Sequence, residues 1–149
     1  MDDVVKLSIE NVENNGGPFS AAIVKDGKII ATGANRVTAT HDPTAHAEVM
    51  AIRNACEKLN TYDLSDCAIY SSCEPCPMCL GAIYWARIPV LYYGNTKTDA
   101  KNINFDDSFI YDELAKSPEH RTLKMVRVKD SGAIKAFELW EEKDDKTLY

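Results

Sequence analysis

Two short segments carry histidine, glutamate and cysteine at the spacing of a metal site, and they constrain the fold more than any other feature. The first is His46-Ala47-Glu48, and the second, 26 residues further on, is Pro75-Cys76-Pro77-Met78-Cys79. One histidine and two cysteines are ligands suited to zinc, and the carboxylate of Glu48 is left over beside them. A catalytic zinc has three protein ligands and an open position, whereas a structural zinc has four. The pattern therefore predicts a catalytic zinc at His46, Cys76 and Cys79.

Both segments should lie where helices begin. A proline on either side of Cys76 suits the first turn of a helix, and Cys76 and Cys79 would then project from one side of that turn. Unpaired N–H groups and the positive end of the helix dipole stabilise thiolates there. Residues two apart do not share a helix face, so His46 and Glu48 can converge only at the start of a helix. We therefore expect the site where two helices begin.

Other interpretations of these residues remain open. A lone Cys-x-x-Cys also occurs in structural zinc half-sites and in redox pairs. Cys56 fits the apolar stripe of a helix and Cys67 a buried strand, while His41 and His120 are more typical of a loop and an exposed position. The sequence assigns none of these four a metal role. It leaves open the role of Cys73, which lies just before the second motif.

Length and charge narrow the class of protein. The 149 residues are 45% hydrophobic, enough for the core of one domain. The chain shows no run of eighteen apolar residues and no basic-then-apolar leader, and its five cysteines form no disulfide pattern, so we expect a cytoplasmic protein with reduced thiols. A formal net charge of −6 and a pI near 5.0 argue against a broad nucleic-acid surface. A small-molecule substrate is expected, with no nucleic acid and no membrane.

Hydrophobic periodicity predicts alternating helices and strands. An N-terminal helix should end before Gly16, and Asp26-Gly27 should turn a β-hairpin. Further elements are expected as a hairpin of residues 19–24 and 28–32, a helix over 45–59 capped by Asp42 or Thr44, a strand over 67–72, a helix over 76–86, strands over 90–94 and 125–129, and a closing amphipathic helix carrying Ile134, Phe137 and Trp140. The expected fold class is α/β, a three-layer α/β/α domain around a mixed sheet of about five strands.

The sequence resembles the cytidine deaminase-like superfamily, and within it the guanine deaminases. The zinc motifs carry the first resemblance, and the segment Phe-Asp-Asp-Ser-Phe-Ile-Tyr at 105–111, with the closing tyrosine, carries the second. The similar segments span most of the chain and comprise residues 16–19, Asn35, residues 42–48, residues 72–86 and residues 105–111.

The resemblance implies hydrolysis of guanine at C2 to xanthine and ammonia, with one Zn²⁺ per subunit held by His46, Cys76 and Cys79. Glu48 would take a proton from the attacking water, pass it to a ring nitrogen and later help to protonate the departing amine. The substrate-binding positions implied by the resemblance are Asn35, Asp107, Phe19, Trp85, Ala47 and Tyr149.

Asp107 also has a physical rationale. Guanine presents N1–H beside its exocyclic amine, and one carboxylate can accept from both, whereas the adenine edge would place an acceptor against it. Without the resemblance, Asp107 is more typical of a helix N-terminus than of a binding site, and Phe19 and Trp85 are more typical of core aromatics. In similar deaminases the C-terminal segment is exchanged between subunits and the final tyrosine closes the partner's active site, which implies a homodimer.

Three other enzyme activities use the same kind of zinc centre. They are deamination of guanosine, of cytosine or cytidine, and of adenosine in tRNA, and the acidic charge disfavours the last. Guanine and guanosine share one purine edge, so the sequence leaves them unresolved. A zinc-stabilised binding module without turnover is a further alternative, and it predicts four protein ligands.

Overall fold

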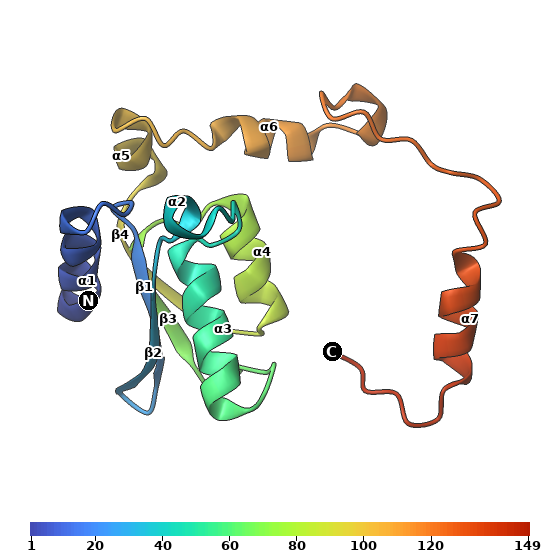
Figure 1. Ribbon diagram of the computed structural model, residues 1–149, viewed down its shortest axis with the longest axis horizontal. Helices are drawn as coiled ribbons and strands as arrows, with labels where there is room; N and C mark the ends of the chain where they lie inside the picture. The colour runs from blue at the N-terminus through green and yellow to red at the C-terminus, as the bar shows by residue number, and fades with distance from the viewer. The chain divides into compact units, whose positions relative to one another are not determined.

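A mixed four-stranded sheet, in the order β2-β1-β3-β4, organises the first part of the chain (Figure 1). Its strands are β1 (Ser20–Lys25), β2 (Lys28–Ala34), β3 (Ala68–Cys73) and β4 (Val90–Asn95). β1 pairs antiparallel with β2 and β3, and β3 pairs parallel with β4. Asp26 and Gly27 have φ of 50° and 72°, so the hairpin has the positive-φ turn that Asp-Gly predicts.

The computed structural model describes all 149 residues. The chain forms two compact units, Met1–Ile110 and Tyr111–Tyr149. The first unit contains the sheet and the helices α1 (Asp2–Glu13), α2 (Val37–Thr40), α3 (Ala47–Leu59), α4 (Pro77–Trp85) and α5 (Lys97–Asn102), and α6 (Ser108–Ala115) begins in it. The second unit holds the rest of α6, the 3-10 helix η1 (Pro118–His120) and α7 (Ile134–Glu142). No helix combines the length and apolarity needed to cross a membrane.

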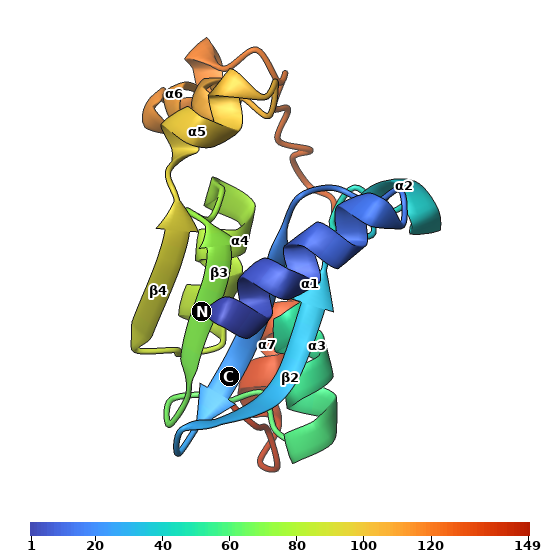
Figure 2. The same cartoon turned by 90° about the vertical axis from the view of Figure 1, so that its left-hand side faces the viewer.

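Helices cover both faces of the sheet, which confirms the three-layer arrangement in the first unit. α1 lies across one face, and α3 and α4 pack against the other (Figure 2). Between the sheet and α3 the core is fully buried and consists of small and branched aliphatic side chains, including Ile23, Ala51, Ala55, Leu64 and Ile69. Alanines on α3 allow the helix to approach the strands closely, so the start of α3 is held against the ends of the strands.

Two expectations from the sequence are wrong. Residues 125–129 form no strand, so the sheet has four strands rather than about five. A strand needs a neighbouring backbone to pair with, and the second unit contains no other strand. Neither Asp42 nor Thr44 is the N-cap of α3, because His46 occupies that position. Asp42 instead accepts hydrogen bonds from Thr44 N, at 2.8 Å, and Thr44 Oγ1, at 2.7 Å, in the preceding loop.

Candidate active site

The three predicted metal ligands come together where two helices begin. His46 is the N-cap of α3 and Cys76 the N-cap of α4, both with extended backbone and neither with a side-chain capping hydrogen bond. Pro77 is the first residue of α4, and Cys79 lies in its first turn. The predicted location at two helix starts is therefore confirmed, and it explains how His46 and Glu48 can converge although they are two residues apart.

The donor atoms fit a tetrahedral zinc site. The Sγ atoms of Cys76 and Cys79 are 3.5 Å apart, and they lie 3.6 and 3.5 Å from His46 Nδ1. Bond lengths of about 2.3 Å to sulfur and about 2.0 Å to nitrogen give a tetrahedral sulfur–sulfur edge of about 3.8 Å and a sulfur–nitrogen edge of about 3.5 Å. The group of potential metal ligands has three members, His46, Cys76 and Cys79. The donor set and spacing therefore match a catalytic rather than a structural zinc.

Electrostatics favour a first thiolate in this cluster and oppose a second. The hydrogen bond from Cys79, together with His46, lowers the pKa of Cys76 to about 4. The same bond to Cys76, together with burial, raises the pKa of Cys79. The hydrogen bond to Cys76 also raises the pKa of His46. A divalent cation would relieve this conflict because it stabilises both thiolates beside a neutral imidazole.

Glu48 is buried beside the cluster and is held by a serine from the sheet. It is 6% exposed, and its Oε1 accepts a hydrogen bond of 3.1 Å from Ser71 Oγ on β3. Burial raises the pKa of Glu48, against the hydrogen bond from Ser71. A carboxylate whose pKa is raised is a stronger base toward water than an ordinary glutamate, which suits the role of a proton shuttle.

A cavity of about 430 Å³ opens onto His46, Glu48 and Cys76. The residues that line it further out are Gly17, Phe19 and Asn35 beside the hairpin, Val37 and Thr38 on α2, Cys73 at the end of β3 and Glu74 after it, and Lys97, Ala100, Asn104, Phe105, Asp106, Asp107, Phe109 and Ile110. All of them belong to the first unit. The volume suits a small planar substrate placed directly against the metal ligands.

Comparisons with known proteins agree with this geometry. The family model of the cytidine and deoxycytidylate deaminase zinc-binding region matches residues 1–95 of the sequence, which include all three metal ligands and Glu48. The chain belongs to this deaminase family.

The similarity of this chain to guanine deaminases extends beyond the zinc-binding region. The guanine deaminase of Bacillus subtilis (strain 168) is 53% identical over 146 residues, which are 97% of this chain and 94% of that protein. Its X-ray structure superimposes with a TM-score of 0.96 at 52% identity, covering 99% of this chain and 95% of that chain. A guanine deaminase from Nitrosomonas europaea is 37% identical, with a TM-score of 0.69 over 71% of this chain and 62% of that chain.

A deaminase that acts on another class of substrate matches a smaller part of this chain. The tRNA-specific adenosine deaminase of Agrobacterium fabrum (strain C58) is 46% identical over 82 residues, which are 55% of this chain and 54% of that protein. This match is confined to about half of the chain, unlike the match to the Bacillus subtilis enzyme. The likeness to the guanine deaminases therefore includes segments outside those 82 residues.

The structure brings three of the six expected substrate-binding residues to the cavity. Phe19, Asn35 and Asp107 line it. The ring of Phe19 meets that of Phe105 edge to face, with centroids 4.9 Å apart. Asn35 Oδ1 accepts a hydrogen bond of 3.3 Å from Val37 N, which leaves the amide nitrogen of Asn35 as a donor for a purine acceptor. Burial and the nearby Cys76 raise the pKa of Asp107.

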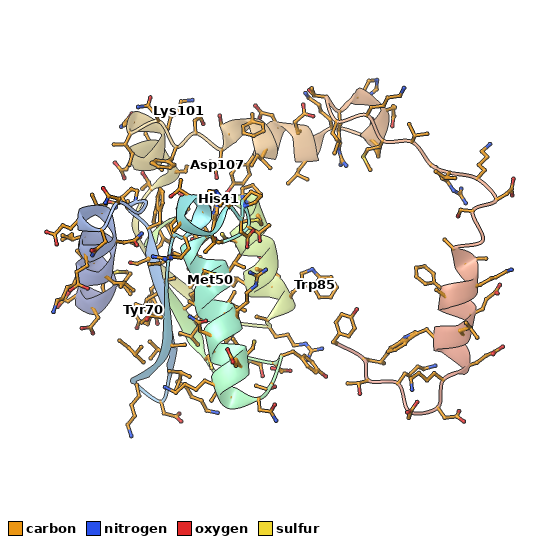
Figure 3. The ribbon with its side chains drawn as sticks, viewed as in Figure 1. His41, Met50, Tyr70, Trp85, Lys101 and Asp107 are labelled. Carbon is orange, nitrogen blue, oxygen red and sulfur yellow. The ribbon has the colours of Figure 1, made fainter.

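The other three expected residues lie elsewhere. Ala47 is fully buried at the start of α3 and does not line the cavity. Trp85 is 72% exposed at the last residue of α4, at the end of that helix away from Asp107 (Figure 3). Tyr149 belongs to the second unit and is 75% exposed. Substrate contacts by these three residues stay predictions.

Sequence analysis missed several residues of the site. No motif in the sequence marks Ser71 as a partner of Glu48, although the alternation of side chains along β3 places Ser71 on the same face as Ile69 and Cys73. Phe105 was noted only as part of the resembling segment. Cys73 is buried, its Sγ lies 3.6 Å from Thr96 O, and burial beside Glu48 raises its pKa to about 11. It is therefore a neutral thiol in the cavity wall and does not belong to the metal group.

Proposed function

We propose that this deaminase hydrolyses guanine to xanthine and ammonia. The observation that carries the proposal is the 53% identity to the guanine deaminase of Bacillus subtilis over 97% of the chain. The cavity adds a chemical reason, because Asp107 lines it together with the zinc ligands. A carboxylate there can accept from guanine N1–H and from the 2-amino group, which adenine could not match.

The chain's own residues account for substrate placement and proton transfer. His46, Cys76 and Cys79 would hold the zinc, which acts as a Lewis acid that lowers the pKa of water and stabilises negative charge on oxygen. Glu48 would take a proton from the water that attacks C2 and deliver it to a ring nitrogen. It would then carry the second proton of that water to the departing amine, so that guanine and water give xanthine and ammonia. Ser71 keeps the carboxylate of Glu48 in one orientation during both transfers.

Ammonia release with metal analysis tests the activity. We expect purified protein to contain one zinc per chain and to release ammonia from guanine faster than from guanosine, cytosine, cytidine or adenosine in tRNA. Glu48→Ala should retain zinc and lose about 10²-fold to 10⁴-fold in kcat. Glu57→Ala, which changes an exposed glutamate on the same helix, is the matched control. Turnover by zinc-loaded Glu48→Ala at nearly the wild-type rate would exclude Glu48 as the proton shuttle.

We further propose that the protein acts as a homodimer that exchanges the C-terminal segment. The second unit has 39 residues, and neither η1 nor α7 contains a buried residue. Its apolar side chains are exposed, with Phe137 at 74% and Val128 at 72%. In the first unit β4 is an edge strand, and Val90 and Tyr92 on it are exposed. Since so short a unit cannot bury a core alone, we propose a second copy of the chain as the partner that covers these surfaces.

Complementation tests the exchange and the role of Tyr149. Deletion of residues 147–149 should weaken guanine turnover more than it lowers the melting temperature. When that variant is co-expressed with Glu48→Ala, each mixed dimer would pair one intact catalytic unit with the intact end of the other chain. Random pairing then restores about a quarter of wild-type activity per site. An inactive mixture, or a monomer by light scattering, would exclude the exchange.

The cysteines also bear on location. All five are free thiols, and two of them are the proposed zinc ligands. Thiolate ligands are maintained in reducing compartments, so we propose that the enzyme works in the cytoplasm.

A further inference from the structure

A buried amide on α1 connects two loops of the cavity wall. Asn11 is 8% exposed, and its Nδ2 donates hydrogen bonds to Gly17 O at 2.7 Å and to Asn35 O at 3.1 Å. Gly17 precedes β1 and Asn35 follows β2, and both line the cavity. Asn11 itself does not line the cavity. One side chain outside the cavity therefore joins the two segments that flank the hairpin.

The glycines of the first loop are fitted to this side chain. Gly16 N donates to Asn11 O at 2.7 Å, and a Cβ added at Gly16 would lie 2.4 Å from Asn11 Nδ2. A Cβ added at Gly17 would lie 3.3 Å from Asn35 Cγ. A side chain at Gly16 would collide with the Asn11 amide, and one at Gly17 would press against the Asn35 side chain, so glycine at both positions lets the loop pack closely. The Gly-Gly pair, Asn11 and Asn35 thus form one packed group.

We infer that Asn11 is a positioning residue for Asn35, an inference that rests on the proposed function. The backbone N–H of Asn35 is already held, because it donates a hydrogen bond of 3.0 Å to Phe19 O at the start of the hairpin. The hydrogen bond from Asn11 Nδ2 holds the backbone carbonyl of Asn35. Without Asn11 the Asn35 and Gly17 carbonyls lose their buried donor, and the Asn35 side chain is then held less firmly, by the 3.3 Å hydrogen bond from Val37 N to its Oδ1. The amide nitrogen of Asn35 then meets the purine less often in the right geometry.

The inference predicts a change in substrate binding without a change in chemistry. Asn35 would contact the purine equally in the ground state and the transition state, so its displacement should raise KM and leave kcat nearly unchanged. Asn11→Leu keeps the size of the side chain and removes both donors. We expect it to raise KM for guanine about threefold to tenfold, with kcat within about twofold of wild type. The inhibition constant of xanthine, which reports binding alone, should rise by the same factor.

Val4→Ala is the matched control for lost stability. Val4 lies on the same helix and is 3% exposed, so its truncation should lower the melting temperature without changing KM. Kinetics are measured below the melting temperature of every variant. Asn11→Ser, which shortens the side chain out of reach of both carbonyls, replaces Asn11→Leu if the latter does not fold.

A double-mutant cycle decides whether Asn11 acts through Asn35. Asn35→Ala should raise KM, and adding Asn11→Leu to it should have no further effect. A KM that stays at the wild-type value in Asn11→Leu, or a full second increase in the double variant, would overturn the inference. Failure of the proposed function is distinguished because wild-type protein would then not turn over guanine. The same ratios would in that case be measured with whichever base of the panel releases ammonia.

Discussion

Gly33→Ala is the substitution whose effect the structure defines most sharply. Gly33 lies on β2 under the start of α3. A Cβ there would be 2.3 Å from Ala47 O and 2.4 Å from Ala51 N, both of them backbone atoms of the helix. Such contacts are essentially never shorter than 3.0 Å, so strand and helix must separate by at least 3.0 − 2.3 = 0.7 Å. No side-chain rotation can relieve this contact.

The separation should affect both stability and catalysis. Overpacking of this kind costs about 1–3 kcal/mol, which lowers the melting temperature by about 3–10 °C in a chain of this length. The displaced turn of α3 follows His46 and carries Glu48. Because a misplacement of about 1 Å can cost about 10²-fold in rate, we expect kcat to fall at least about tenfold.

The assay combines thermal unfolding, zinc content and the rate of ammonia release. Gly81→Ala is the control, because a Cβ at Gly81 in α4 meets nothing within 4 Å. Alanine is the better helix former there, so this variant should gain about 0.5–1 kcal/mol and keep its activity. The reasoning is refuted if Gly33→Ala unfolds and turns over like wild type, or if Gly81→Ala shows the same losses.

Three further predictions concern the site and the fold. Ser71→Ala should lower kcat about threefold to tenfold because the carboxylate of Glu48 loses its hydrogen bond, and Ser71→Thr should retain most of the rate, as steady-state kinetics would show. Hydrogen bonds from Ser65 and the ion pair with Arg87 hold the pKa of Asp63 at about 2, below its ordinary 3.8. Its contribution to stability is therefore present above pH 3.8 and lost as the pH falls through about 2, and urea unfolding at several pH values should show Asp63→Asn without that loss. Chelation should abolish ammonia release and lower the melting temperature, and added zinc should restore both, because a ligand of the folded state stabilises it.

Local chemistry in the sequence was sufficient to predict the metal centre. The ligand types define the metal, and Pro77 together with the spacing of Cys76 and Cys79 indicates the start of a helix. The two-residue spacing of His46 and Glu48 placed their segment at another helix start, and the structure confirms this. These properties depend on residues within one turn of each other. They could therefore be predicted without knowledge of the rest of the fold.

The fifth strand and the cap of α3 were predicted wrongly because local pattern was not the deciding factor. Alternation at residues 125–129 permits a strand, but a strand exists only where another backbone supplies its hydrogen bonds. Asp42 and Thr44 are good capping residues by type, yet the helix begins after His46. In both cases a tertiary requirement overrode a correct statement about local preference.

What the sequence alone determined about this protein is the chemistry of its centre: one imidazole, two thiolates and a free carboxylate at two helix starts. Only the tertiary structure decided what surrounds that centre. Ser71 reaches Glu48 across 23 positions of the chain and Asn11 reaches Asn35 across 24, and neither pair shares a motif. Such contacts depend on strand register and on the distance between helix and sheet, which are set by packing of the whole core rather than by neighbouring residues.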